Sequence, residues 1–505
     1  MGDVPSGLAD RVIFSAGTSR KLNTNNLNAA TYFESINILD SGYNIHGNSV
    51  RIGFFSAHYP AGTSSTFRPD IVAWGDLYVT EEVQGSTLNL LGDIILANNN
   101  LIFPVASVGD VNLQGVISGT GSVVKNSTAG EVTFSGSGAN TYTGATRVEG
   151  GTLRLSRYAL PFSLGTVAVP GDLIIGFQGS VVLERNNQIA DTAEVINDWG
   201  ILDLNDNTDT IGSLTGFGGV RVATNGKLTV GANNRTTSYP GGISGGGSFD
   251  KIGIGTLVFS GEHTFTGPTR ILNGRLRVDG RLTSTSSITV SNGATLSGIG
   301  SVSDVNVSTG GILHPGAGGA NGSLLATGVV TFAAASIFQV ELAAPSSFDS
   351  LTIASAGAVN LGSSTLRVLP GPGVKEDDSF SIVTKLGTGA VTGTFQGLPE
   401  GQRFVVSNRV FQITYRGGTG NDVVLTRLSA PAVSLSITGP HLDEMQISGR
   451  GVPTLLYVLE GTSNLKPPIT WKPLGTNVAN ASGGFSFVDA YTNRTAARFY
   501  RAWSP

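Results

Sequence analysis

The most closely spaced acidic residues lie in the segment Leu202–Asp209, where Asp203, Asp206 and Asp209 recur at every third position. Such carboxylates can bind calcium, and on the outside of a β-helix they can act as the acid and base of a polysaccharide-cleaving enzyme. Asn and Asp are also the residues from which turns are built, and the segment holds no Arg or Lys to orient an acidic sugar. A turn is therefore the favoured interpretation, with calcium binding and then catalysis as the alternatives.

A second candidate calcium segment is Gly417–Asp422, with the sequence GGTGND. It is similar to one unit of a calcium-binding nonapeptide repeat, and such sites form between successive turns, of which only one is present. A glycine turn that leads into a strand at Val423–Leu425 is the favoured interpretation. Asn421 and Asp422 are kept as calcium candidates.

The remaining chemistry-bearing residues give no recognisable site. The five histidines have no carboxylate or second histidine at a metal-ligand spacing in the sequence; they are His46, His58, His263, His314 and His441. There is no cysteine, hence no thiolate ligand, disulfide or cysteine nucleophile. No P-loop, dinucleotide fingerprint, G-x-S-x-G or H-E-x-x-H motif stands in a suitable context. The sequence predicts no catalytic residue, no cofactor-binding residue and no enzyme, and calcium is the one candidate cofactor.

The chain contains two segments of related sequence, Val132–Leu155 and Val258–Val278. The segments that precede them, Val116–Lys125 and Gly242–Lys251, are also related in sequence. Within each copy apolar and polar residues alternate between glycine and Asn-Gly turns, which indicates short strands with one buried face. Strands this short bury that face by stacking coil on coil. The pattern predicts an all-β chain, a right-handed parallel β-helix (solenoid).

These two copies resemble the autotransporter-associated β-strand repeat, also called the passenger-associated transport repeat. Its usual form includes S-G-x-N-T-Y-T-G-x-T-x-V-x-x-G-T-L, which the first copy follows from Ser135 through Tyr142 to Leu153. The resemblance implies an exported bacterial protein, secreted or at the cell surface, with a β-helical body. It implies no chemical activity.

Composition excludes several partners. Of 505 residues only 13% are charged, and the net charge is −4, so no basic field exists to bind nucleic acid or an anionic membrane. No apolar run is long enough for a membrane-spanning helix. Met1–Pro5 has neither the basic nor the apolar region of a signal peptide, so we expect that the export signal is not present in this chain or that the chain is a fragment.

Changes in pattern along the chain predict five regions. They are an N-terminal cap with the first rungs (1–61), the parallel β-helix with the repeats (62–320), its C-terminal rungs and cap (321–427), a linker (428–434) and a small β-sandwich-like module (435–505). Within them, the irregular segment Tyr59–Asp70 is expected to be a loop. The last region is similar to a terminal domain of secreted proteins from Verrucomicrobia-like bacteria, through Leu459-Glu460, Trp471, Gly484–Asp489 and Arg498–Arg501. That resemblance implies secretion or surface retention.

The preferred hypothesis is a non-catalytic structural or adhesive protein of the bacterial cell surface or extracellular space. Its expected partners are extracellular polysaccharide, other surface proteins or further copies of itself, with no nucleic acid and no membrane span. Two alternatives stay open. One is a polysaccharide-active lyase or hydrolase that uses Asp203, Asp206 and Asp209, and the other is a spacer segment of a larger surface protein.

Overall fold

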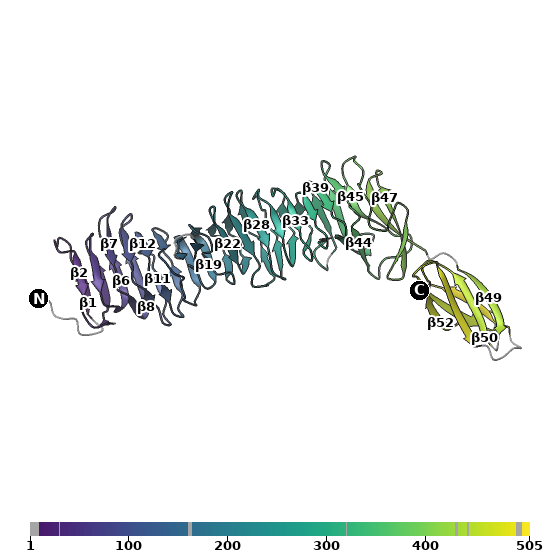
Figure 1. Cartoon of the computed structure of the whole chain (residues 1–505), viewed down its shortest axis with the longest axis horizontal. Helices are drawn as coiled ribbons and strands as arrows, with labels where there is room; N and C mark the ends of the chain where they lie inside the picture. The colour runs from purple at the N-terminus through teal and green to yellow at the C-terminus, as the bar shows by residue number, and fades with distance from the viewer. Residues whose placement is uncertain are drawn as a thin grey trace. The chain divides into compact units, whose positions relative to one another are not determined.

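The computed structural model describes residues 10–29, 31–159, 164–319, 321–429, 433–441, 444–490 and 497–504. In this part of the chain every regular element is a β-strand, and it holds no helix that is long and apolar enough to cross a membrane. The chain divides into two compact units, residues 1–306 and 307–505. The strands of each unit can be followed by their colours in Figure 1.

The first unit is a parallel β-solenoid in which each strand pairs in register with the strand one coil later. Nine consecutive strands of one continuous ladder, from β7 to β27, are here called ladder A. Its strands are β7 (Ser64–Phe67), β9 (Thr87–Leu90), β12 (Asp110–Leu113), β15 (Glu131–Phe134), the second half of β16 (Thr146–Leu155), the second half of β19 (Leu173–Leu183), β21 (Ile201–Asp203), β24 (Gly219–Arg221) and β27 (Gly242–Ser244).

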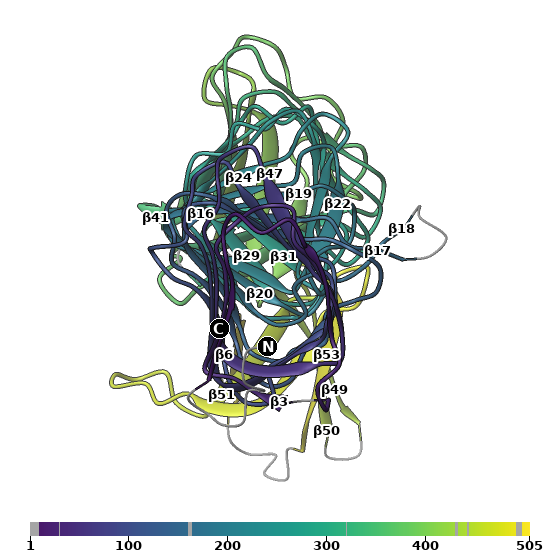
Figure 2. The ribbon, with the colours of Figure 1, turned by 90° about the vertical axis from the view of Figure 1, so that its left-hand side faces the viewer.

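Two further ladders run beside ladder A, ladder B in the same coils and ladder C from residue 208 onward. Ladder B passes through the first halves of β16 and β19; its other strands are β8 (Ile71–Glu81), β11 (Leu101–Phe103), β14 (Val123–Lys125), β20 (Glu194–Asn197) and β23 (Ser213–Thr215). Ladder C contains β22 (Thr208–Ile211), β25 (Lys227–Val230), β28 (Ser248–Lys251), β30 (Thr269–Ile271) and β33 (Ile288–Val290). Viewed along the stack, successive coils of the first unit lie behind one another (Figure 2).

Alternation in the sequence explains this architecture, because each strand sends every second side chain inward. On ladder A the inward positions form one row of aliphatic side chains that are at most 3% exposed: Leu88, Val111, Val132, Leu153, Val181, Leu202, Val220 and Ile243. Burying each such side chain contributes about 1.5–3 kcal/mol. Outward positions carry ion pairs instead, such as Arg154 Nε to Glu131 Oε2 at 2.6 Å. The predicted parallel β-helix is confirmed.

The two sequence copies enter the solenoid on different faces. In the first copy the strand β15 lies on ladder A, and its counterpart in the second copy is β29 (Thr256–Phe259). Ladder A leads instead to β27, whereas β29 pairs with β26 (Thr237–Tyr239) and β31 (Arg275–Val278). Related sequence therefore forms equivalent strands on different faces of the solenoid, so the repeat is not restricted to one face.

The N-terminal coils are built in the same way. They contain β1 (Arg11–Phe14), β2 (Leu22–Asn25), β4 (Ser35–Ile38), β5 (Asn44–Gly47) and β6 (Val50–Ala57). The segment predicted to be a loop, residues 59–70, contains β7, which pairs with β5 and β9. That prediction was wrong. Ser64-Ser65-Thr66 is polar and shows no apolar alternation, but it forms a strand, and Ser65 is buried against the neighbouring coils.

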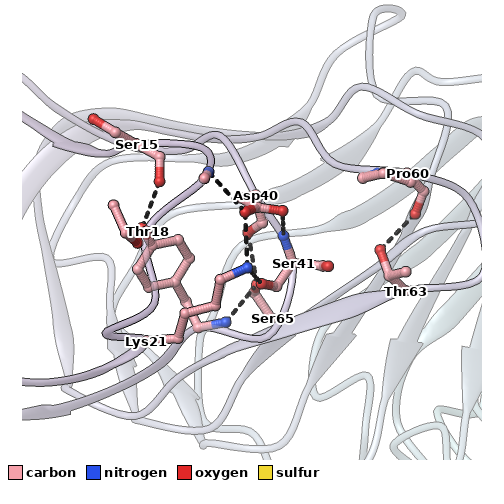
Figure 3. Close-up of polar contacts among 10 residues, drawn as sticks. Ser15, Thr18, Lys21, Asp40, Ser41, Pro60, Thr63 and Ser65 are labelled. Carbon is pink, nitrogen blue, oxygen red and sulfur yellow. Dashed lines mark hydrogen bonds and ion pairs between the residues drawn. The ribbon is translucent and has the colours of Figure 1, made fainter.

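Polar contacts join successive N-terminal coils (Figure 3). Lys21 Nζ donates to Asp40 Oδ2 at 2.7 Å, and the Ser65 hydroxyl donates to the Asp40 carbonyl at 3.2 Å. The Tyr43 hydroxyl donates to the carbonyl of Ser15 at 2.6 Å. The Lys21 hydrogen bond, together with backbone amides, holds the pKa of the Asp40 carboxyl below its usual value. Outside the coil, β17 (Tyr158–Ala159) and β18 (Leu164–Gly165) pair antiparallel at the side of the first unit (Figure 2).

The second unit begins with further parallel pairs and changes to antiparallel pairing. The parallel pairs join β37 (Ile312–Pro315), β40 (Ile337–Ala344) and β44 (Thr365–Pro370), then β38 (Ser323–Ala326), β42 (Ser350–Ile353) and β45 (Ser379–Lys385), and finally β39 (Val329–Phe332) and β43 (Ala358–Asn360). From β45 the order continues antiparallel through β48 (Asp422–Leu428), β47 (Arg409–Gly417) and β46 (Arg403–Val406).

The C-terminal module consists of two antiparallel three-stranded sheets. One contains β49 (Ser434–His441), β50 (Glu444–Arg450) and β53 (Gly484–Ala490), and the other β52 (Lys472–Val478), β51 (Leu456–Thr462) and β54 (Phe499–Trp503). Its core includes Tyr457, whose ring stacks on Phe485 with 4.5 Å between centroids. The sandwich-like prediction is confirmed, and the domain boundaries given above stay predictions.

Candidate binding surface

The structure does not gather Asp203, Asp206 and Asp209 into one group. Asp203 Oδ1 accepts the amide of Asn205 at 2.9 Å, and Asp206 Oδ1 accepts the amide of Asn225 at 3.0 Å. Arg221 Nη1 lies 4.0 Å from Asp203 Oδ2, so a cation does stand near the segment, contrary to the sequence-based expectation. It comes from the next coil, which the sequence could not place.

Asp209 points into the interior and is 1% exposed. Its Oδ2 accepts the amides of Gln188 at 2.7 Å and Ile189 at 3.2 Å, and no described group donates to its Oδ1. Burial raises the pKa of Asp209 to about 7. Asp209 thus links two successive coils through its Oδ2, and it offers solvent no carboxylate for catalysis or for calcium.

The second calcium segment forms the turn between β47 and β48, as the favoured interpretation stated. Asn421 Nδ2 donates to the carbonyl of Gly387, and Thr419 Oγ1 donates to Asn421 Oδ1 at 2.8 Å. Asp422 Oδ1 accepts the amide of Lys385 at 2.9 Å. Both calcium candidates therefore make hydrogen bonds that shape the turn, and calcium binding there stays an untested prediction.

The histidines lie in different surroundings. His58 is exposed beside Glu82, with 3.3 Å between His58 Nδ1 and Glu82 Oε2. His263 is buried, and His441 has a side chain outside the described residues. His314 is the one that sequence reasoning missed, because the structure brings it beside Glu341 and Asp349. Those carboxylates are distant in sequence, and no local spacing signals the group.

The most distinctive exposed feature of the first unit is a set of aromatic rings at three successive coils, here called the aromatic corner. It consists of Phe177, Trp199 and Phe217, which are 75%, 60% and 55% exposed. The rings of Trp199 and Phe217 are stacked, with 5.3 Å between centroids and 9° between planes. Large aromatic side chains are normally buried, and contiguous exposed ones mark interaction sites.

Strand pairing places these rings at one corner of the coil. Phe177 lies where β19 passes from ladder B to ladder A, Trp199 lies between β20 and β21, and Phe217 lies between β23 and β24. Because those strands pair in register, their corners stack at the spacing of neighbouring strands, about 4.8 Å. The three turns are therefore neighbours, and the rings of Trp199 and Phe217 stack across two of them.

Glycines make the tight corner feasible. Gly216 has φ +97°, and a Cβ there would lie 2.2 Å from the carbonyl oxygen of Asn197. Asn197 is fully buried below the corner, and its Nδ2 donates to the carbonyl of Gly219 at 2.8 Å. The backbone is thus fixed by the neighbouring coil, so the rings are held outward on a rigid support. Exposed polar residues of the same corner, Gln178 and Asp198, provide hydrogen-bonding groups beside the rings.

Comparison with known proteins agrees with this architecture. A family model described as the passenger-associated-transport-repeat matches residues 129–155 and 249–278. The chain carries two passenger-associated transport repeats. Both matches fall on the copies found in the sequence, and they add nothing about the C-terminal module, whose resemblance stays a prediction.

Two curated relatives match parts of this repeat protein. The extracellular serine protease of Serratia marcescens is 31% identical over 210 residues, which are 40% of this chain and 19% of that protein. The adhesin BmaC autotransporter of Brucella suis biovar 1 (strain 1330) is 35% identical over 89 residues, 17% of this chain and 3% of that protein. The chain thus spans less than a fifth of the length of either relative.

Among solved structures, the Haemophilus influenzae Hap adhesin covers 79% of this chain and 64% of its own, at 12% identity and a TM-score of 0.25. A likeness at that TM-score adds nothing to the fold assignment, which rests on the strand pairings. The strand pairings show a parallel β-solenoid, and two of its segments match the passenger-associated-transport-repeat. The aromatic corner is a feature of this chain's own residues.

Proposed function

We propose that the chain is an extracellular, surface-exposed and non-catalytic adhesive solenoid, and that it binds polysaccharide at the aromatic corner. The observation that carries the proposal is the stacked, exposed pair Trp199 and Phe217 on a rigid parallel ladder. Surface exposure is supported by the names of the relatives, one an extracellular protein and the other an autotransporter adhesin.

The chemistry of the corner favours a sugar chain. Flat aromatic faces pack against the C–H faces of pyranose rings, and an aromatic ring supplies a large contact area at a small entropic cost. Neighbouring polar side chains such as Gln178 and Asp198 can hydrogen-bond sugar hydroxyls. A strip of three rings on successive coils fits an extended polymer better than a compact ligand.

Pull-down of the whole chain on insoluble cellulose and chitin tests the proposal, because both polymers present flat β-linked rings. We expect retention by the polymer and at least a tenfold weaker affinity for Trp199→Ala, a loss of about 1.4 kcal/mol or more. Phe217→Ala should weaken binding in the same direction. Ile254→Ala is the matched control, since Ile254 is 75% exposed elsewhere in the first unit. Unchanged retention of Trp199→Ala, or equal weakening by Ile254→Ala, would refute the assignment.

The polysaccharide-cleaving alternative makes a different prediction. It requires Asp203, Asp206 or Asp209 to reach a substrate, but Asp209 is buried and the other two carboxylates cap turns. We therefore expect no release of reducing or unsaturated sugars from the bound polymers. Release of such products that is lost in Asp206→Ala would support the enzyme instead.

A further inference from the structure

A group of three metal-ligand side chains, two of them buried, lies in the second unit. It consists of His314, Glu341 and Asp349, whose ligand atoms all lie within 4.8 Å of one another; it is the one such group among the described residues. We propose that these three side chains bind a single divalent transition-metal ion of the zinc class. The proposal is independent of polysaccharide binding.

The separations of the ligand atoms match a metal site better than a hydrogen-bonded pair. His314 Nε2 lies 3.4 Å from Glu341 Oε1 and 3.3 Å from Asp349 Oδ2. Both distances are long for charge-assisted hydrogen bonds, which are about 2.7–2.9 Å. Tetrahedral zinc with ligands at about 2.0–2.2 Å separates neighbouring ligand atoms by roughly 3.3–3.6 Å. The two distances from His314 Nε2 therefore have the length of the edges of a zinc tetrahedron, and all three ligand atoms lie within 4.8 Å of one another.

Strand pairing assembles the group from distant segments. β37 and β40 are parallel with Leu313 opposite Phe338, which sets His314 at the end of one strand beside the next coil. After β40 the chain turns back through β41 (Ser347–Phe348), which pairs antiparallel with it. The Asp349 amide then donates to the Glu341 carbonyl at 2.8 Å. This return brings the second carboxylate to the histidine.

Backbone hydrogen bonds fix the more deeply buried carboxylate. Asp349 Oδ1 accepts the amide of Gly322 at 3.1 Å, and Oδ2 accepts the amide of Glu341 at 2.9 Å. The side chains of His314 and Asp349 are only 4% and 1% exposed, whereas that of Glu341 is 29% exposed. Two ligands are thus preorganised in the interior, and the third lies on the side from which an ion can enter.

A polar side chain lies at the second ring nitrogen of His314. Gln339 Nε2 lies 3.5 Å from His314 Nδ1, and Arg367 Nη1 donates to Gln339 Oε1 at 3.2 Å. A metal-bound imidazole donates its second ring N–H to an acceptor, so zinc binding requires the Gln339 side-chain amide to present its oxygen to His314 Nδ1. Arg367 binds Gln339 and not the two carboxylates, so a metal ion would supply the positive charge that neutralises them.

The ligand types select the metal. Calcium and magnesium prefer sets made wholly of oxygen, whereas one imidazole with two carboxylates suits zinc and its transition-metal neighbours. A dication balances the two carboxylates, which otherwise repel each other in a buried site. Three protein ligands leave a fourth position for water.

Zinc titration of the whole chain, first stripped with a chelator, tests the site by calorimetry and by elemental analysis after dialysis. We expect one zinc per chain with a dissociation constant of roughly 1 µM or tighter. Glu341→Gln, at the most exposed ligand, should weaken binding at least tenfold, and Asp349→Asn should abolish it. Circular dichroism checks that each variant is folded, so that a lost site is distinguished from a lost fold.

Asp250→Asn is the matched control, because Asp250 is also a buried carboxylate, 4% exposed, and it is paired with Arg270. It should bind zinc as the unaltered chain does. Cobalt(II) in place of zinc should give the intense visible bands of a tetrahedral ion. The proposal fails if no zinc is retained, if folded Glu341→Gln binds as tightly as the unaltered chain, or if calcium binds more tightly than zinc.

Discussion

The two transport repeats build the same coil with different polar side chains at one equivalent position, Asn140 in the first copy and His263 in the second. In the first, Asn140 Oδ1 accepts the amide of Ile117 at 3.0 Å and Nδ2 donates to the carbonyl of Ala168 at 2.7 Å. In the second, His263 Nδ1 accepts the amide of Ile243 at 3.3 Å. Among the described residues no group pairs with its Nε2.

The shared element is a backbone amide that needs an acceptor at a point where the strand ladder is interrupted. Either side chain supplies it, so the coil tolerates the exchange. The free-energy cost of burying the side chain differs, because both polar ends of Asn140 are hydrogen-bonded, whereas Nε2 of His263 has no described partner. Packing offsets part of the cost for His263, since its ring stacks on Phe259 with 3.9 Å between centroids.

The strongest test of equivalence is the aliphatic core of the two copies. Leu153 and Leu276 are both at most 1% exposed, so we expect Leu153→Ala and Leu276→Ala each to lower the free energy of unfolding by about 2–5 kcal/mol. Urea unfolding, together with hydrogen exchange of the neighbouring coils, measures the loss. Leu272→Ala, at a 41% exposed site, should change stability by no more than about 0.5 kcal/mol. A large loss in one copy alone would show that the copies are not equivalent.

Low pH should destabilise the second copy more than the first, because only the second has a buried histidine at this position. Burial lowers the pKa of His263 to about 3, below the ordinary value near 6.5 in the unfolded chain. The unfolded state therefore binds more protons between these values, and stability that is present above pH 6.5 is lost as the pH falls toward 3. We expect His263→Asn to remove roughly 2–3 kcal/mol of the loss between pH 7 and pH 4.

Urea unfolding of both chains at the two pH values checks the acid effect. His58→Asn serves as control, because the His58 side chain is 61% exposed. An acid response of His263→Asn equal to that of the unaltered chain would contradict a neutral, buried imidazole.

A hydroxyl distinguishes the copies at the next inward position. The hydroxyls of Tyr142 and Thr146 are 2.5 Å apart and both buried, whereas the second copy has Phe265 and pairs the Thr269 hydroxyl with that of Thr285 at 3.2 Å. Tyr142→Phe leaves the Thr146 hydroxyl without that partner, so we expect a loss of about 1–2 kcal/mol in urea unfolding. Tyr78→Phe, at a 39% exposed ring, should have little effect, and equal losses in the two variants would remove the distinction.

The smallest expected effect concerns a lysine that both copies share. Lys125 Nζ donates to the carbonyl of Ser127 at 2.8 Å, and Lys251 Nζ donates to the carbonyl of Ile252 at 2.6 Å. Burial lowers the pKa of each to about 8. Since the unfolded lysines stay protonated to about pH 10.4, stability should rise between about pH 8 and 10, by about 1 kcal/mol for each lysine once solvent screening is allowed for.

Lys251→Met should reduce the increase in stability between pH 8 and 10 by about 1 kcal/mol, the contribution of one lysine, and Lys125→Met should do the same. Urea unfolding from pH 7.5 to 10 measures the slope. An unchanged slope in both variants would show that the two ammonium groups are better solvated than their burial indicates.

Much of the fold follows from the sequence because its cause is local. Alternation such as Thr146-Arg147-Val148 sets the inward and outward sides, and glycines such as Gly151 (φ +62°) set the turns. The strands of the two sequence repeats must then stack on neighbouring coils, because neither repeat can bury its apolar face alone. The turn at Gly417–Asp422 was predictable for the same reason. The polar strand β7 was not, since its pairing comes from its neighbours.

The candidate sites were decided by tertiary structure. Asp203, Asp206 and Asp209 are close in sequence, yet the strand period turns Asp209 inward and leaves the other two to cap turns. Phe177, Trp199 and Phe217 belong to three coils, and only the register of the ladders aligns their corners.

By itself the sequence determined that this chain stacks short strands into a parallel solenoid, because alternation and turns act over a few residues. Only the tertiary structure decided which side chains meet across coils, including His314 with Glu341 and Asp349. The physical reason is that the length of each coil varies with its turns. A residue's neighbour one coil away is therefore fixed by hydrogen-bond register, and no constant spacing in the sequence records it.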